Sequence, residues 1–168
     1  MLEQVWHTSA SIIPCIFELM TLKEKTYQTC VALVQLKIDT LQKNLHDLTD
    51  SAGNETKRTA GDKHETALAM LQIEQENNSR QLKEVLQQKA VLEKLDPQLQ
   101  TATIVRGSLV ETNKGRFYIS IGLGKLKVND ETVFAVSPEA PLGKLLLMKK
   151  AGDTFTFNDT DYKIISIT

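Results

Sequence analysis

The apolar residues in the first half of the chain recur with a helical period. From Thr21 onward they lie alternately four and three positions apart, at Tyr27, Val31, Val34, Ile38, Leu41, Leu45 and Leu48. This spacing is typical of a coiled-coil seam and is sustained for about three heptads. Because polar residues fill the positions between, the pattern predicts a helix that buries one narrow stripe.

A second stretch, from Thr66 to Leu95, predicts a partner helix with a less regular stripe. Its inward-facing residues are expected to be Ala67, Leu71, Leu82, Val85, Leu92 and Leu95, with Glu74 and Asn78 interrupting the seam. Residues 47–65 lie between the two stretches and contain two glycines and several short polar residues, the composition of a helix end and a turn. We therefore expect an antiparallel hairpin, on the order of 40 Å long for helices of about 28 residues.

After Asp96-Pro97 the pattern changes from helix to strand. Short runs alternate and are rich in Val, Ile, Phe and Tyr: TIVRGSLVET, GRFYISIG, TVFAVS, TFTFND and YKIISIT. One segment, PLGKLLLMKKAGD from Pro141 to Asp153, has a helical period and ends near Gly152. The predicted fold class is α+β, with an N-terminal antiparallel coiled-coil hairpin followed by a small, mostly antiparallel β-sheet domain carrying one short helix.

The predicted domain organisation has three parts. Residues 1–20 form an N-terminal extension, 21–97 the hairpin and 98–168 the sheet domain. The extension has an apolar patch from Ile12 to Phe17, but Pro14 interrupts it and it is too short to span a bilayer. We therefore expect no membrane association.

Charge and cysteine content narrow the function classes. The chain has 20 basic and 21 acidic side chains, so it has no excess positive field for binding nucleic acid or anionic membranes indiscriminately. Its two cysteines, Cys15 and Cys30, form no CxxC pair, which argues against a zinc ribbon and a disulfide scaffold. A reducing, cytoplasmic location fits this composition best.

Asp62 and Glu65 follow Gly61 at the expected start of the second helix. One interpretation is a capping box, in which Asp62 accepts from the free amides of the first turn and Glu65 reaches back. The other is that two exposed carboxylates at the tip of a rod bind a hard divalent cation. Two oxygens do not complete a Mg²⁺ site, so the remaining ligands would come from another molecule.

Other possible motifs have no supporting context. His64-Glu65 begins like the zinc motif HExxH, but Leu68 occupies the position of the second histidine. GLGKLK, from Gly122 to Lys127, lacks the helix that a phosphate-binding loop requires. Ser137 has no histidine in its half of the chain, so self-contained nucleophilic catalysis is not expected. We also expect no cofactor bound by the chain alone.

Two stretches resemble one family. GDKHETA, from Gly61 to Ala67, resembles the tip signature Gly-Asp-Leu-Ser-Glu-Asn-Ala of the bacterial Gre transcript-cleavage factors, GreA and GreB. Residues Val136 to Asp153 resemble that family's carboxyl-terminal domain in their Ser-Pro, Pro-Leu-Gly and Lys-Lys-x-Gly-Asp run. Together the resemblance covers residues 21–168 in the family's order.

The resemblance implies an FKBP-like fold for the sheet domain and a transcription elongation factor that binds RNA polymerase. The hairpin would enter the polymerase's secondary channel, where Asp62 and Glu65 would assist catalysis in trans by holding a Mg²⁺ ion shared with the polymerase. The protein would be a monomer, not an enzyme alone, and would meet the nascent RNA 3′ end only indirectly. The partner contacts implied are Lys63, His64, Ser137, Pro138, Pro141, Leu142 and Gly143.

The tip departs from the family pattern at Lys63, His64 and Thr66, although both acids are present. Two alternatives therefore stay open beside cleavage stimulation. The protein could occupy the secondary channel as a regulator without promoting cleavage. It could also be a structural protein whose coiled coil pairs with another helix and whose acids only cap.

Overall fold

The computed structural model describes residues 20–55 and 62–168, with only the backbone of residues 54, 55 and 62–65. It divides into two compact units. The first combines the described part of residues 1–29 with Asp96–Thr168, and the second is Cys30–Leu95. The expected N-terminal extension lies outside the described residues except for Met20.

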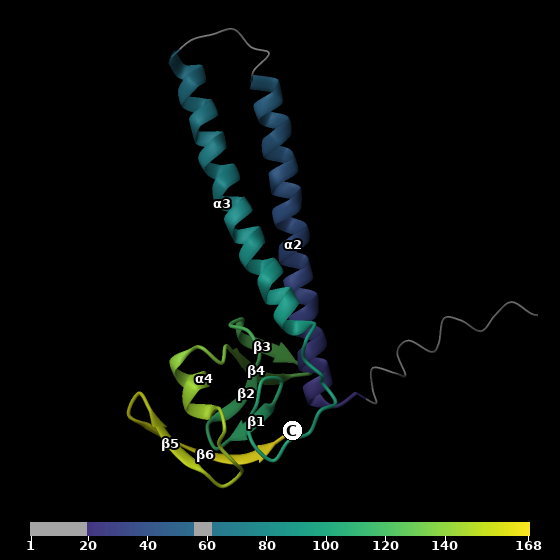
Figure 1. The fold of residues 1–168 in the computed structure, drawn as a ribbon, viewed down its shortest axis with the longest axis vertical. Helices are drawn as coiled ribbons and strands as arrows, with labels where there is room; N and C mark the ends of the chain where they lie inside the picture. The colour runs from purple at the N-terminus through teal and green to yellow at the C-terminus, as the bar shows by residue number, and fades with distance from the viewer. Residues whose placement is uncertain (1–19, 56–61) are drawn as a thin grey trace, which may run out of the picture. The chain divides into compact units, whose positions relative to one another are not determined.

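Two long helices, α2 (Leu22–Glu55) and α3 (Asp62–Leu92), form the predicted hairpin and lie side by side (Figure 1). They contain 34 and 31 residues, so at 1.5 Å per residue they are about 51 and 46 Å long. Both are longer than predicted, because α2 continues through Gly53 and α3 begins at Asp62. One internal glycine costs a helix only about 1 kcal/mol, which is too little to end it.

Polar bonds between the two helices define their register. Lys89 Nζ donates to Gln35 Oε1 at 3.0 Å, and Gln75 Nε2 donates to Thr49 Oγ1 at 3.3 Å. The step from Gln35 to Thr49 along α2 equals the step from Lys89 back to Gln75 along α3, two heptads in each case. The helices are therefore antiparallel. Residues that lie equally far before and after Asp62 in the sequence face each other across the hairpin.

The predicted stripe of α2 is right in its middle and wrong at its start. Val34 and Ile38 are buried, but before them the buried side chains are Lys23, Thr26 and Cys30, whereas Tyr27 and Val31 are only half-buried. Lys23 and Thr26 belong to the first unit, where Lys23 bonds the carbonyl of Leu99, so burial at the start of α2 does not follow the hairpin seam alone.

In α3, the predicted residues Val85 and Leu92 are buried. Between Leu71 and Leu82 the seam passes through the half-buried Gln75 and Asn78, while Glu74 is exposed. The polar interruption that the sequence predicts is therefore real, but Gln75 rather than Glu74 occupies it.

The start of α2 carries a reciprocal cap that the sequence interpretation missed. The backbone N–H of Thr21 donates to Glu24 Oε2 at 2.7 Å, and that of Glu24 donates to Thr21 Oγ1 at 3.3 Å. These bonds form a capping box, which satisfies amides that have no partner within the helix. The bonds from Thr21 are also the main reason that the pKa of Glu24 lies below its usual value.

A six-stranded sheet forms most of the first unit, in the order β3-β4-β2-β1-β6-β5. The strands are β1 (Leu109–Thr112), β2 (Gly115–Ile119), β3 (Gly124–Val128), β4 (Glu131–Val136), β5 (Thr154–Phe157) and β6 (Thr160–Ile167). Strands β2 and β4 pair in parallel and the other neighbours are antiparallel, so the sheet is mixed, as a mostly antiparallel prediction allows.

Strand β3 was not predicted. Its Leu126 and Val128 are buried, but Lys125 and Lys127 point to water on an edge strand that pairs only with β4. Lysines on edge strands discourage pairing with another chain, and here they also hide the apolar alternation. Gly124 begins the strand at a φ of +76°, a left-handed conformation that glycine adopts without steric cost.

One face of the sheet packs on the short helix α4 (Pro141–Leu146). Its core contains Ile104, Val110, Phe117, Ile119, Leu146, Phe155 and Ile164. The helix is shorter than predicted, because Met148 turns to a φ of +65°. The chain then pairs with Ile104, whose carbonyl accepts from Met148 and whose N–H donates to Lys149, both at 2.9 Å.

Part of the other face of the sheet is also buried. Leu109, Tyr118 and Val133 lie on it by register and are at most 7% exposed. The first turns of α2 belong to the same unit, and their Lys23 and Thr26 are 5% and 0% exposed. Side chains at the start of α2 line a pocket with β1, β2 and β6 on this face, so helical residues lie against part of it.

Replacing Thr21 by Ala should lower the free energy of unfolding by about 1 kcal/mol, because it removes the side-chain half of the capping box. Urea denaturation monitored by circular dichroism measures this change. Thr40→Ala is the matched control, since the Thr40 hydroxyl only bonds Leu36 within α2. We expect the control to stay within about 0.5 kcal/mol of the parent, and equal effects for the two variants would contradict the cap.

Candidate functional site

The tip residues Asp62 and Glu65 both lie in the first turn of α3, because the helix begins at Asp62. The hairpin register also places Asp62 at the end of the rod. The side chains of Asp62, Lys63, His64 and Glu65 lie outside the described residues, so the capping box and the metal-binding interpretation both stay predictions. What the backbone establishes is that the two carboxylate residues occupy one helical turn.

The second candidate region is the loop from Ser137 to Pro141, between β4 and α4. Ser137 Oγ donates to Glu139 Oε2 at 2.5 Å and accepts from the backbone N–H of Glu139 at 3.2 Å. The Ser137 carbonyl accepts from Ala140 N–H at 3.0 Å, which closes a tight turn. Pro141 then starts α4, a position where its missing N–H costs nothing.

Charge also stabilises this loop. Arg106 Nη2 donates to Glu139 Oε1 at 2.6 Å. The hydrogen bond from Ser137 is the main cause that lowers the pKa of Glu139, followed by the bond to its own backbone N–H and the nearby Arg106. The Ser-Pro run in the sequence indicated this loop. The part of Arg106 could not be predicted, because 33 residues separate it from Glu139.

Gly143 explains why the Pro-Leu-Gly segment needs a glycine. A Cβ at this position would lie 2.0 Å from the carbonyl oxygen of Ser137 and 3.0 Å from the Cα of Pro138. Both contacts are with backbone, which cannot turn aside as a side chain can. Helix α4 therefore packs against the loop at a distance that only glycine allows.

The residues predicted to contact a partner differ in exposure. Pro138 and Gly143 are buried, Ser137 and Leu142 are half-buried, and Pro141 is exposed. Two neighbours that the sequence interpretation left out are more accessible, since Leu145 is 39% and Met148 73% exposed. Contact with a partner stays a prediction, and the accessible side chains for it are Ser137, Pro141 and Leu142.

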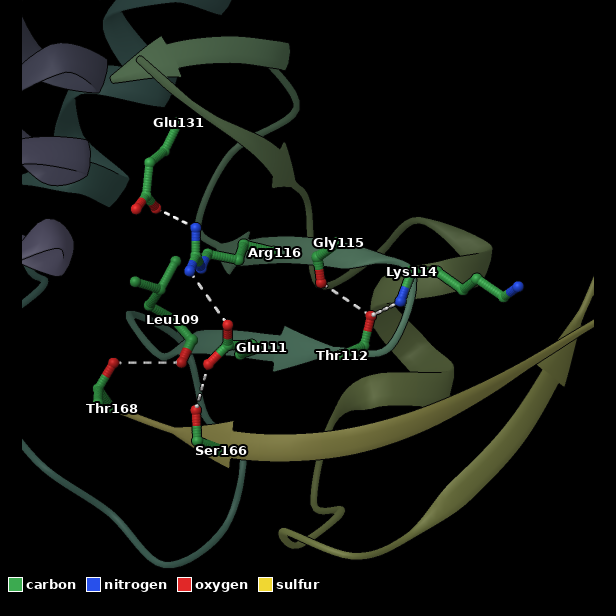
Figure 2. Close-up of polar contacts among 9 residues, drawn as sticks. All are labelled: Leu109, Glu111, Thr112, Lys114, Gly115, Arg116, Glu131, Ser166 and Thr168. Atoms are coloured by element: carbon green, nitrogen blue, oxygen red, sulfur yellow. Dashed lines mark hydrogen bonds and ion pairs between the residues drawn. The ribbon is translucent and has the colours of Figure 1, made fainter. Parts of the chain in front are cut away.

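A third polar group lies on the sheet face away from α4 (Figure 2). Arg116 Nη1 is paired with Glu131 Oε2, and its Nη2 lies 3.1 Å from Glu111 Oε1. Ser166 Oγ donates to the second oxygen of Glu111 at 3.1 Å. The sequence contains the signal for this cluster, because Glu111 and Arg116 flank one hairpin turn symmetrically and are cross-strand partners.

Among the side chains that the structure describes, no group of three His, Cys, Asp or Glu could hold a metal ion. None of the described helices is long and apolar enough to cross a membrane.

The comparisons with known proteins include a structural similarity. No protein-family model matches the chain, and no curated protein matches it. A solved structure titled "Structure of the transcription factor Gfh1" is similar at 12% sequence identity, over 82% of this chain and 92% of that one, with a TM-score of 0.33. At that identity and TM-score the similarity does not carry a functional assignment, which has to come from the chain's own residues.

Gly143→Ala should lower the free energy of unfolding by roughly 1–3 kcal/mol, because the new methyl group forces the Ser137 backbone to move. Gly53→Ala is the matched control, since a Cβ there meets no atom within 4 Å and Gly53 lies inside α2. This control should be neutral or stabilising by up to about 1 kcal/mol. Denaturant titration compares the two, and a Gly143→Ala variant as stable as the parent would contradict the steric account.

Ser137→Ala should raise the pKa of Glu139 toward the ordinary value of about 4.3, because the main cause of its depression is lost. In the parent, the depressed pKa means that Glu139 contributes stability above its unfolded pKa, and that this contribution disappears as the pH falls through the folded pKa. A ¹³C NMR titration of the Glu139 carboxyl measures the shift. Ser166→Ala, whose hydroxyl bonds Glu111 instead, should leave the Glu139 titration unchanged.

Proposed function

We propose that this chain is a Gre-like transcription elongation factor of the cytoplasm. It binds RNA polymerase, inserts its hairpin into the secondary channel and stimulates the cleavage of backtracked RNA by the polymerase. The observation that carries the proposal is a hairpin of two helices, 34 and 31 residues long, with Asp62 and Glu65 in the first turn of α3 at its end. A thin rod with acids at its tip suits a deep, narrow channel.

The sequence resemblance at Gly61–Ala67 and Val136–Asp153 supports the same assignment. So does the steric need for Gly143, which gives the Pro-Leu-Gly resemblance a physical reason. In this proposal the protein is not an enzyme by itself. The polymerase supplies the active site, and the loop from Ser137 to Pro141 forms part of the contact with it.

The tip residues fit a shared Mg²⁺ ion by their chemistry. Carboxylate oxygens are hard ligands of the kind that Mg²⁺ prefers, and the ion usually keeps several ligands from water or substrate phosphates. When bound, a second Mg²⁺ would stabilise charge on the oxygens of a phosphoryl displacement. Asp62 and Glu65 would help to hold and position this ion in trans, at an active site that belongs to the polymerase.

A second candidate function is a regulator that occupies the secondary channel without promoting cleavage. The departures at Lys63, His64 and Thr66 favour it. A lysine next to two carboxylates competes with a metal ion for their negative charge. This candidate keeps the hairpin and the loop contacts but does not need Asp62 and Glu65 as metal ligands.

RNA cleavage in backtracked elongation complexes tests the proposal. The parent should accelerate cleavage, and the Asp62→Asn, Glu65→Gln double variant should lose at least about tenfold of the stimulated rate while binding polymerase equally well. Asp47→Asn, Asp50→Asn is the matched control, because it removes two exposed carboxylates from α2 that lie away from the tip. The control should cleave as the parent does.

The alternatives give different results in the same assay. Competition with a known cleavage factor, without any cleavage, would assign the regulator. Absence of both cleavage and polymerase binding would refute the proposal and leave Asp62 and Glu65 as a helix cap in a structural protein.

A further inference from the structure

A pocket of about 400 Å³ opens within the first unit, on the sheet face away from α4. Its walls come from the start of α2, the loop Pro97–Gln100 and the strands β1, β2 and β6. Leu22, Pro97 and Leu109 give it an apolar part. A cavity of this size with a few polar groups converging on it has the dimensions of a small-molecule site.

Lys23 lines this pocket and is the only charged residue among the described ones that belongs to the buried class. It is 5% exposed, and its Nζ donates to the carbonyl oxygen of Leu99, in the loop that forms one wall. An ammonium group has three donors, and this bond uses one of them. No carboxylate of the described residues lies within ion-pair distance of it.

The other charges around the pocket already have partners. Arg116 is held between Glu111 and Glu131, and the second oxygen of Glu111 accepts from Ser166. Glu24 is held by Thr21 and accepts a longer bond from Gln98 at 3.4 Å. Among the lining charges, Lys23 therefore has a neutral carbonyl as its described hydrogen-bond partner and no described carboxylate within ion-pair distance, and burying a charge without a close counter-ion is unfavourable.

Desolvation lowers the pKa of Lys23, and the nearby carboxylate of Asp96 only partly offsets this. Asp96 is itself engaged, since its Oδ1 accepts from the backbone N–H of Gln98 at 2.8 Å. The environment thus disfavours the charged form of Lys23 in the empty pocket. A negative group placed beside the ammonium would reverse that preference.

We propose that this pocket binds a small organic anion, with a carboxylate or phosphate group placed at Lys23 and an apolar body against Leu22, Pro97 and Leu109. The oxyanion would supply the counter-ion that the described chain does not offer. The binding site is separate from the hairpin tip in sequence and chemistry, and it does not depend on the proposed polymerase function. Size and lining favour a compact ligand with a single anionic group.

The test uses the full chain and three probes: benzoate, phenyl phosphate and the neutral benzamide. Binding is followed by ¹³C NMR of the lysine Cε groups and by the melting temperature. Benzoate or phenyl phosphate should saturate, raise the pKa of Lys23 and raise the melting temperature, whereas benzamide should bind at least about tenfold more weakly, the loss of roughly 1.4 kcal/mol. Whichever anion binds more tightly identifies the oxyanion class.

Lys23→Met keeps the length of the side chain and removes the charge, and it should weaken anion binding at least about tenfold. Lys43→Met is the matched control, because Lys43 is an exposed lysine of the same helix. Equal affinity of Lys23→Met and parent for the anions would overturn the proposal. If Lys23→Met fails to fold, the parent's Lys23 titration decides alone, and a pKa that no anion moves would also overturn it.

Discussion

A hairpin of two helices can bury only the stripe that each helix turns toward the other, and this limit governs the hairpin unit. Its buried apolar side chains are Cys30, Val34, Ile38, Val85 and Leu92. Beyond Ile38 along α2, and before Val85 along α3, the described apolar residues are half-buried or exposed. The distal part is therefore held largely by backbone hydrogen bonds, half-buried leucines and the bond between Gln75 and Thr49.

The hairpin helices expose several large apolar side chains. Met70 and Ile73 on α3 are 66% and 59% exposed, and Leu36 on α2 is 62% exposed. Apolar side chains on a slender support gain most from a partner that surrounds them, because the hairpin has no further layer to cover them. The sheet unit differs, because both of its faces contain buried side chains and a loop is fixed by the backbone approach at Gly143.

The sequence predicted what depends on repeated local patterns. The hairpin, five of the six strands and the helix at Pro141 all follow from the spacing of apolar residues. The sequence-based predictions failed where a contact distant in sequence decides the structure. Pairing with Ile104 ends α4 early, and β3 can carry exposed lysines because it lies at the edge of the sheet. The capping box at Thr21 and the cross-strand pair of Glu111 and Arg116 could have been predicted from their spacing in the sequence. Arg106 and Lys23 bond residues that are far away in the sequence, so only the folded structure identifies their partners.

The start of α3 also limits how its tip can act. The amides at a helix N-terminus carry a partial positive charge, which stabilises carboxylates in the first turn and opposes a cation at the same place. Asp62 and Glu65 are thus well placed as negative groups but poorly placed to hold Mg²⁺ by themselves. A metal ion held mainly by other ligands would gain from the two carboxylates at less cost, because those ligands would offset the repulsion. The position of the acids in the first turn therefore favours action in trans over a metal site that belongs to the chain alone.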